Sequence, residues 1–284
     1  MTVERVSASG AELWTETSGW GPVPVVLCHG GPGLSDNLAP VAAMLGDIAN
    51  VHRYDQRGGG RSTGDPPFTL AQFVEDLEAL RQHWGHAAWV VGGHSWGAWL
   101  SLMYAMAHGS RVSAIIGLDM PPPPNEGWRE SYRRVRDSRL SGSERKFFEE
   151  IRGRRRSGEP ISAGEERRWI HLNWRTDFAQ PGATPDLDRE PLYAFPVNHA
   201  VNRALVEEMD GFAATRDVAA SLGSIRAPAM FIHGTGDPRP APEGVIAALP
   251  NAYLRTVDDA GHLPWFEQPA AVADALREFL RSVE

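Results

Sequence analysis

A serine between two glycines is the most informative pattern in this sequence. Ser95 lies in the pentapeptide Gly93-His94-Ser95-Trp96-Gly97, after the apolar run 87–91 and before a helical stretch. A strand, a sharp turn and a helix form the context in which a G-x-S-x-G motif builds a nucleophile elbow. The turn is too tight for side chains at the positions two residues before and after the serine. Glycine at Gly93 and Gly97 avoids the clash, and the serine hydroxyl stays exposed. The pattern predicts that Ser95 is a nucleophile.

A serine hydroxyl is a weak nucleophile at neutral pH, so it requires a general base, and the base requires an orienting acid. In this type of site the acid and the histidine follow the serine in that order. Asp237 ends the segment 231–237, which has the pattern of a strand running into a turn. His262 lies in a loop just after the last predicted strand. We predict Ser95 as nucleophile, His262 as general base and then acid, and Asp237 as the carboxylate that orients it.

Other residues near these positions fit structural roles better. Asp258 and Asp259 are closer to His262 in sequence, but neighbours on one loop seldom point at each other, and both fit solvated loop charges. His233 is an alternative base, although its place at a strand end favours a structural histidine. For His94, beside the nucleophile, packing and pocket lining are equally consistent with the sequence. No H-x-x-x-H spacing or carboxylate cluster indicates a metal site.

Attack on a carbonyl group creates a negatively charged oxygen that backbone N–H groups must stabilise. One donor is expected to be the N–H of Trp96, directly after the nucleophile at a helix N-terminus. The second is expected from the glycine-rich loop 29–33, where the backbone can approach a substrate closely. We favour the N–H of Gly31, with Gly30 as the alternative donor. Gly30 and His94 are also predicted to contact the substrate.

Strand-like and helical segments alternate at both ends of the chain. Residues 5–17 are predicted to form a hairpin that turns at Ser9-Gly10. Short apolar runs bounded by glycine, proline or aspartate predict further strands at 23–28, 51–54, 87–91, 112–118, 229–232 and 253–257. Helical spacing predicts helices at 38–45, 70–84, 96–108, 242–249 and 269–283. This alternation predicts an α/β fold with a mostly parallel sheet flanked by helices.

The middle of the chain has a different pattern. Four prolines, 121–124, end a predicted strand, and the stretch up to residue 224 is helical and charged, without strand-like runs. Tryptophan, phenylalanine and leucine recur through it, which favours an ordered insertion over a disordered linker. We predict a helical cap at 121–224 on a core formed by 1–120 and 225–284. The arginine run 154–156 is interpreted as a solvated face.

The composition is that of a soluble globular protein. Apolar residues make up 42%, the net charge is −8, and the pI is near 5.7, so no general attraction to nucleic acid or anionic membranes is expected. Cys28 is the single cysteine, in an apolar run typical of a packed, reduced thiol. Neither a signal peptide nor a run of 18 apolar residues is present, so a cytoplasmic protein is expected. The sequence does not indicate an oligomeric state.

Five motifs, in order, resemble the proline iminopeptidase (prolyl aminopeptidase) branch of the α/β-hydrolases. They are HGGPG at 29–33, DQRGGGRS at 55–62, GGHSWG at 92–97, HGTGD at 233–237 and GH at 261–262. The resemblance implies an α/β-hydrolase fold with an inserted helical cap and a Ser-His-Asp hydrolase that requires no cofactor. It also implies removal of an N-terminal proline or small residue. The segment 55–62 is expected to brace the active-site loops.

Two positions depart from the family pattern. His94 stands immediately before the serine, where the family usually has glycine. Family members hold the substrate ammonium with cap carboxylates, one typically after a tryptophan, and in the nearest match, 167–175, arginine takes that place. A cation there would repel an ammonium group by roughly 1–4 kcal/mol at about 4 Å. Four glutamates are possible substitutes: Glu165, Glu166, Glu207 and Glu208.

The sequence therefore predicts a serine hydrolase that cleaves an amide or ester bond of a small molecule or short peptide through an acyl-enzyme. An esterase or lactonase acting on a small metabolite with the same three residues is the alternative. An α/β-hydrolase scaffold that only binds a ligand is an alternative of another class, and the complete set of Ser95, Asp237 and His262 argues against it. Related enzymes with an aspartate nucleophile are disfavoured by Ser95.

Overall fold

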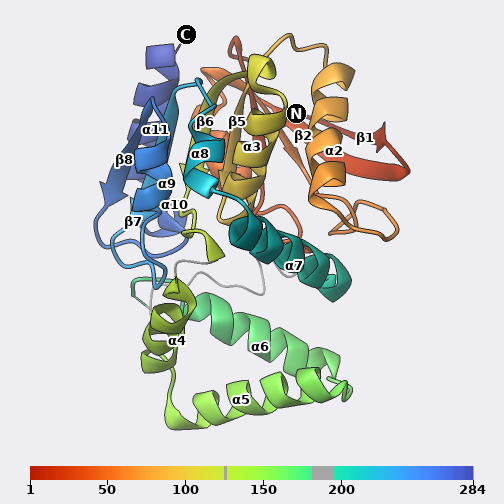
Figure 1. The fold of residues 1–284 in the computed structure, drawn as a ribbon, viewed down its shortest axis with the longest axis vertical. Helices are drawn as coiled ribbons and strands as arrows, with labels where there is room; N and C mark the ends of the chain where they lie inside the picture. Colours follow the sequence, from red (N-terminus) through yellow and green to blue (C-terminus); the bar gives the residue numbers. More distant parts are fainter. Residues whose placement is uncertain (125–126, 181–194, 284) are drawn as a thin grey trace.

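A twisted eight-stranded sheet forms the centre of the protein in the computed structural model, which describes residues 1–124, 127–180 and 195–283 (Figure 1). The strands are β1 (Thr2–Ala8), β2 (Ala11–Ser18), β3 (Val23–Cys28), β4 (Ala49–Tyr54), β5 (Trp89–His94), β6 (Val112–Leu118), β7 (Ala229–Gly234) and β8 (Ala252–Val257). Their order is β1-β2-β4-β3-β5-β6-β7-β8. Only β2 runs antiparallel to its neighbours, so the predicted mostly parallel sheet is confirmed.

The predicted N-terminal hairpin is confirmed. Ala8 pairs with Ala11, and the two residues between them form the turn. Ser9 has φ 34° and Gly10 has φ 82°. Positive φ at both central positions is the geometry that matches the twist of a two-residue hairpin.

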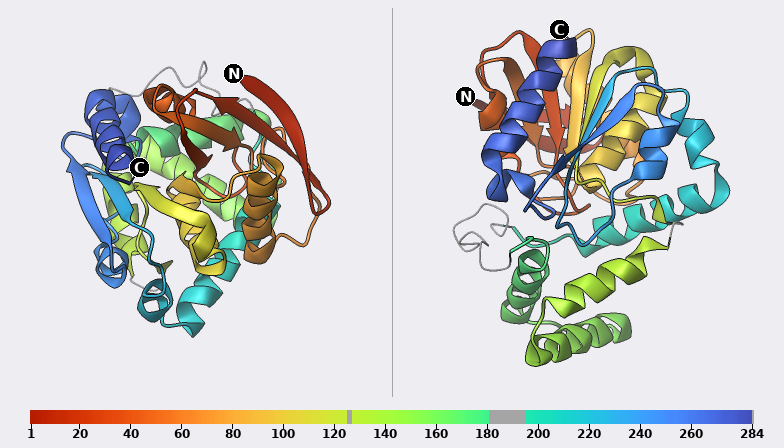
Figure 2. Two further views of the ribbon diagram at one scale, coloured as in Figure 1. Left: turned by 90° about the horizontal axis from the view of Figure 1, so that it is seen from above. Right: turned by 90° about the vertical axis from the view of Figure 1, so that its left-hand side faces the viewer.

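Helices cover both faces of the sheet (Figures 1 and 2). On one face lie α1 (Ala39–Leu45) and α11 (Pro269–Val283), and on the other lie α2 (Leu70–His83), α3 (Trp96–Ala107), α8 (Val218–Leu222) and α9 (Glu243–Ala248). Successive residues of β3 show the arrangement. Val25 packs in the apolar cluster on the face of α1 and α11, and Val26 packs in the cluster on the face of α2 and α3. A strand buried on both faces requires such a continuous apolar run. Two short helices, η1 (Gly109–Arg111) and α10 (Pro264–Glu267), complete the core.

The helices inserted between β6 and β7, apart from α8, lie beyond one edge of the sheet (Figure 1). They are α4 (Trp128–Ser138), α5 (Gly142–Ser157), α6 (Ala163–Arg175) and α7 (His199–Thr215). Helices α4 to α6 stand apart and have their own small apolar cluster around Phe148, whereas Leu205 of α7 is part of the core cluster beside α3. Residues 125–126 and 181–194 of the predicted cap lie outside the described residues, and its limits stay a prediction.

The arginine run 154–156 is not simply a solvated face, as its charge pattern had suggested. Arg154 pairs with Glu165, and Arg155 pairs with Glu166 and stacks on the Trp169 ring at 3.9 Å. These contacts join the end of α5 to α6, so two of the three arginines hold the cap helices together.

Cys28 is a free, buried thiol, as expected from its apolar run. Burial raises its pKa to about 12, so the side chain is the neutral thiol at physiological pH. Within the part of the chain that the structure describes, no helix combines the length and apolar character that crossing a membrane requires.

A pair of histidines, His52 buried and His86 half-buried, lies at the junction of β4 with the end of α2. The His52 ring stacks on Trp84 with 3.9 Å between ring centroids, and its Nε2 lies 2.9 Å from Nε2 of His86. Burial first, and then the neighbouring His86, lower the pKa of His52 to about 3. His52 is therefore neutral in the folded protein over the whole range in which a histidine ordinarily titrates.

We expect this burial to make the fold less stable in mild acid. An unfolded histidine takes up a proton near pH 6.5 but folded His52 does not, so its contribution to stability is present above about pH 6.5 and is lost as the pH falls. At about pH 5 the loss should reach about 2 kcal/mol. Urea unfolding of wild type and His52→Phe, which keeps a ring on Trp84, at about pH 7.5 and pH 5 measures it. An equal loss in both proteins would contradict the assignment to His52.

Candidate active site

A strained turn at the end of β5 presents the predicted nucleophile. The strand ends at His94, α3 begins at Trp96, and Ser95 between them has φ 54° and ψ −113°. A non-glycine residue with positive φ is uncommon and marks backbone strain at a functional position. A Cβ at Gly93 would lie 2.2 Å from the Gly97 carbonyl carbon. The predicted strand, turn and helix around Ser95 are therefore present, and the motif's first glycine is required by the close approach.

The loops after β7 and β8 bring Asp237 and His262 together. Nδ1 of His262 lies 2.6 Å from Oδ2 of Asp237, and both side chains are buried. A carboxylate only accepts hydrogen bonds, so Nδ1 donates and Nε2 carries the lone pair that a general base needs. Although burial raises the pKa of the Asp237 carboxyl, the His262 imidazole and the Arg239 guanidinium hold this pKa below its ordinary value. Asp237 is thus an anion that orients His262.

Ser95 and His262 line one cavity of about 130 Å³ at the carboxyl edge of the sheet. Gly30, Gly31 and His94 line it from the core side. From the cap side it is closed by Asn173, Trp174 and Asp177. Among the described residues no hydrogen bond joins the Ser95 hydroxyl to His262, and such contacts commonly tighten only when substrate is bound.

The predicted backbone donors belong to two segments next to Ser95, the first turn of α3 and the loop after β3. Trp96 is the first residue of α3, and the first N–H groups of a helix have no partner within it. Gly31, with φ 54°, and Gly30 line the cavity on the opposite loop. Gln56 connects the loop after β3 to the first turn of α3. Its Nε2 donates to the carbonyl of His29 at 2.8 Å, and its Oε1 accepts from the Trp96 indole at 2.8 Å. This is the bracing expected of the segment 55–62.

His94 both packs and lines the cavity. Its Nε2 donates to the carbonyl of His262 at 2.8 Å, and its ring lies 4.6 Å from the His262 ring and 4.8 Å from Trp265. Burial, and then the neighbouring His262, lower the pKa of His94 well below its ordinary value, so it stays neutral. Its buried Nδ1 has no hydrogen-bond partner within the described residues. The side chain fills the space above Gly30, where a Cβ would lie 2.5 Å from Nδ1.

Sequence reasoning missed the charged pair at the cap side of the cavity. Asp177 and Arg239 both line it, and their side chains are bonded to each other. Arg239 stands two residues after Asp237, which is the one local signal that could have found it. Asp177 follows α6 and enters the site only through long-range packing. Arg175, which had suggested a cation in the site, instead bonds Glu144 of α5 at 2.8 and 2.9 Å.

The four glutamates considered as substitutes for an ammonium-binding carboxylate lie elsewhere. Glu165 pairs with Arg154, and Glu166 pairs with Arg155 and His199. Glu208 accepts a hydrogen bond from the backbone of α2, and Glu207 lines a separate surface cleft. None of the four lines the Ser95 cavity in the structure as described.

The remaining histidine and acid candidates do not line the Ser95 cavity in the part of the chain that the structure describes. Asp258 and Asp259 are exposed on their loop. His233 is buried, and its Nε2 lies 3.2 Å from the carbonyl of Arg239. Asp119, His233 and Asp237 lie close enough together to ligate a metal ion, but the Asp237 oxygens already accept from His262 and Arg239. Burial and the neighbouring Asp237 raise the pKa of Asp119 well above its ordinary value.

Comparison with known proteins agrees with this geometry. A family model described as alpha/beta hydrolase fold matches residues 23–269. A proline iminopeptidase of Neisseria gonorrhoeae is 28% identical over 98% of this chain and 94% of its own length, and one of Xylella fastidiosa is 38% identical over 33% of this chain and 31% of its own. The resemblance to proline iminopeptidases is therefore confirmed over nearly the whole chain.

Solved structures show the same fold. A thermophilic esterase from Thermogutta terrifontis superimposes with a TM-score of 0.71 at 23% identity, covering 100% of this chain and 99% of its own. A proline iminopeptidase from Mycobacterium smegmatis superimposes with a TM-score of 0.69 at 21% identity, covering 99% and 98%. Fold similarity at this level of identity is shared by esterases and peptidases alike.

The first turn of α3 lies so close to the end of β3 that a glycine-to-alanine substitution should have opposite effects on stability at Gly97 and at Gly153. A Cβ at Gly97 would lie 2.0 Å from the Cys28 carbonyl oxygen, whereas at Gly153 in α5 it meets nothing within 4 Å. Gly97→Ala should therefore destabilise the fold by about 1–3 kcal/mol, and Gly153→Ala should stabilise it by about 0.5–1 kcal/mol. Urea unfolding measures both. Equal stability of the two variants would contradict the tight packing of α3 on the end of β3.

Proposed function

The chain belongs to the α/β-hydrolase fold family, and on that premise we propose that it is a serine hydrolase that cleaves an amide or ester bond through an acyl-enzyme. The observation that carries the proposal is the 2.6 Å contact between His262 Nδ1 and Asp237 Oδ2, at a cavity that Ser95 also lines. That contact leaves Nε2 of a buried, oriented imidazole free to act as the base.

In the first half-reaction the Ser95 oxygen attacks the carbonyl carbon, and the hydroxyl proton passes to Nε2 of His262. The carbonyl π electrons move to the oxygen, which becomes an anion held by the backbone N–H groups of Trp96 and Gly31. When the carbonyl re-forms, the bond to the leaving nitrogen or oxygen breaks, and the imidazolium returns its proton to that atom. Ser95 then carries the acyl group as an ester.

In the second half-reaction a water molecule takes the place of the nucleophile. His262 removes one of its protons, and the hydroxide oxygen attacks the ester carbon of the acyl-enzyme. Collapse of the second tetrahedral anion breaks the bond to the Ser95 oxygen, which recovers its proton from the imidazolium. The carboxylic acid leaves, and the serine and neutral histidine are restored without a cofactor.

The relatives favour a proline iminopeptidase-like substrate, a short peptide with a free N-terminus. One observation favours the second candidate, an esterase or lactonase on a small uncharged molecule. Asp177, a carboxylate that lines the cavity with Ser95, is bonded through both of its oxygens to Arg239. A carboxylate already neutralised in this way attracts an ammonium group weakly, so a neutral amide or ester fits the cavity as well.

The role of Ser95 is tested by covalent labelling with a fluorophosphonate. We expect wild type to be modified at Ser95 and Ser95→Ala to stay unlabelled and to lose at least about 10⁴-fold in kcat on p-nitrophenyl acetate. Ser101→Ala is the matched control, because Ser101 is fully buried in α3, where its hydroxyl donates a hydrogen bond to the Gly97 carbonyl. Full activity in Ser95→Ala, or equal labelling of it, would contradict the role of Ser95, whereas wild type that is neither labelled nor active would favour the ligand-binding scaffold.

The two substrate classes are separated by blocking the amine of one substrate. We expect prolyl naphthylamide and its N-acetyl derivative to be hydrolysed with similar kcat/KM, because Asp177 is neutralised by Arg239. Both reactions cleave the same type of bond, so differences in leaving-group reactivity do not enter. A preference of more than about tenfold for the free amine, equivalent to about 1.4 kcal/mol, would show ammonium recognition and favour the peptidase.

A further inference from the structure

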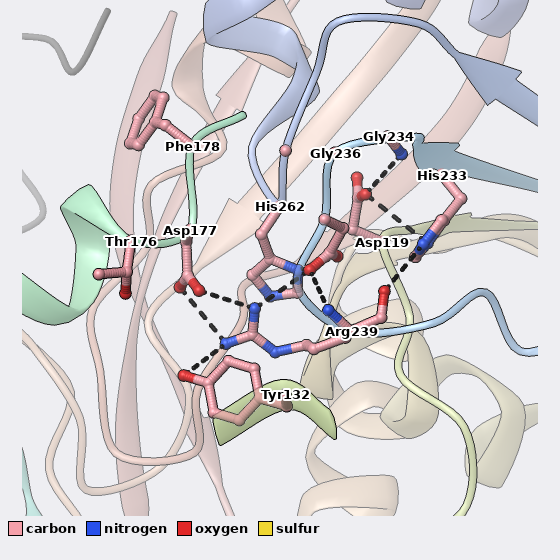
Figure 3. Close-up of polar contacts among 12 residues, drawn as sticks. Asp119, Tyr132, Thr176, Asp177, Phe178, His233, Gly234, Gly236, Arg239 and His262 are labelled. Atoms are coloured by element: carbon pink, nitrogen blue, oxygen red, sulfur yellow. Dashed lines mark hydrogen bonds and ion pairs between the residues drawn. The ribbon is translucent and has the colours of Figure 1, made fainter. Parts of the chain in front are cut away.

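Arg239 lies between two carboxylates at the wall of the Ser95 cavity (Figure 3). Its Nη1 is 2.8 Å from Oδ1 of Asp177 and 3.3 Å from Oδ1 of Asp237. Its Nη2 is 3.3 Å from Oδ2 of Asp177 and 3.4 Å from the Tyr132 hydroxyl, and the guanidinium stacks on the Tyr132 ring at 4.5 Å. The arginine is thus fixed on three sides.

The second oxygen of Asp237 is occupied entirely by Arg239. Oδ1 accepts from the Arg239 backbone N–H at 2.9 Å and from the guanidinium, while Oδ2 accepts from His262. A carboxylate bonded through both oxygens cannot rotate about its Cβ–Cγ bond. The ring of His262 therefore takes its orientation from a group that Arg239 holds in place.

Asp177 holds Arg239 from a segment that is itself fixed to the His262 loop. The His262 backbone N–H donates to the Asp177 carbonyl at 2.7 Å, and a Cβ at Gly261 would lie 2.1 Å from that oxygen. Arg139, just after α4, donates to the carbonyls of Thr176 at 2.7 Å and of Gly236 at 2.8 Å. The segment after α6 and the loops of Asp237 and His262 form one hydrogen-bonded unit.

A largely buried ion pair is a weak source of net stability, because desolvation of the two charges offsets most of their attraction. The Asp177–Arg239 pair is placed instead where its charges act on the base. We propose that Arg239, held by Asp177, is a positioning residue that fixes the Asp237 carboxylate and sets the pH range in which His262 works. This inference rests on the proposed function, because it takes His262 to be the base.

Of the other titratable groups that the structure describes around Asp237 and His262, Arg139 is also a cation, but its guanidinium donates to backbone carbonyls rather than to Asp237. Burial raises the pKa of Asp119 and lowers those of His233 and His94, so all three are neutral. Burial also raises the pKa of Tyr132 to about 12. The charged groups that remain nearby are Asp177, Arg239, Arg139 and Glu267, which accepts from the backbone N–H groups of Ala179 and Gly261.

Removing the charge of Arg239 and removing the charge of Asp177 should move the pH profile of kcat/KM in opposite directions. In Arg239→Gln the loss of a positive charge favours the imidazolium, so the acidic limb of kcat/KM should move up by about one pH unit. In Asp177→Asn the loss of a negative charge should move it down by a similar amount. The double variant should return close to wild type. The readout is kcat/KM against pH with p-nitrophenyl acetate.

Two further variants separate positioning from a general structural effect. Arg239→Lys keeps the charge and should restore the acidic limb, and Arg175→Gln, which breaks the pair with Glu144, should leave it unmoved. Arg239→Gln loses the guanidinium hydrogen bond to Oδ1 of Asp237. This loss should lower kcat by about 10- to 100-fold, with a smaller change in KM. Near-UV circular dichroism and fluorophosphonate labelling confirm that each variant is folded and retains its nucleophile.

The inference is overturned if Arg239→Gln is folded and labelled and its acidic limb coincides with that of wild type. If Arg239→Gln does not fold, Asp177→Asn decides, and an acidic limb of Asp177→Asn that coincides with that of wild type overturns the inference. Failure of the proposed function has a different signature, because wild type would then not be labelled at Ser95 at all.

Discussion

Backbone segments at the carboxyl edge of the sheet are packed against one another with no room for a side chain, and the site depends on this packing. The first turn of α3 rests on the end of β3, with the Gly97 Cα against the Cys28 carbonyl. The loop that carries His262 rests in the same way on the Asp177 carbonyl. Distances between the reacting groups are therefore set by backbone contacts, which tolerate less variation than the packing of flexible side chains.

The fold could be predicted from the sequence because each face of the sheet is covered by helices. Strands buried on both faces are continuous apolar runs, and those at 23–28 and 112–118 begin and end where predicted. Other strands differ from the prediction at their ends, and the strand predicted at 87–91 is instructive, since β5 begins at Trp89 and extends to His94. Gly92 and Gly93 suggest a turn by composition, but in the sheet Gly92 lies against Leu27, where a Cβ would be 3.0 Å from its side chain. Tertiary packing extends the strand through residues with no strand preference of their own.

Part of the site was also predictable, because the chain order of serine, acid and histidine is fixed by where β5, β7 and β8 end. The contact between Asp237 and His262 follows from that order, while their catalytic roles stay predictions. Asp177 was not predictable, because nothing in the local sequence of α6 indicates that the following segment turns back onto the core. Arg175 led to a wrong expectation for the same reason. Its charge is visible in the sequence, but its partner Glu144 is determined by the packing of α5 on α6.

The cap has two connected effects on the chemistry. Asn173, Trp174 and Asp177 close the cavity from above, and the same segment gives His262 a backbone acceptor and Arg239 a counter-charge. A change in the segment after α6 that alters the shape of the cavity therefore also alters the charge beside His262. A carboxylate at position 177 without Arg239 would place an uncompensated negative charge close to Asp237, and the pairing of Asp177 with Arg239 compensates that charge.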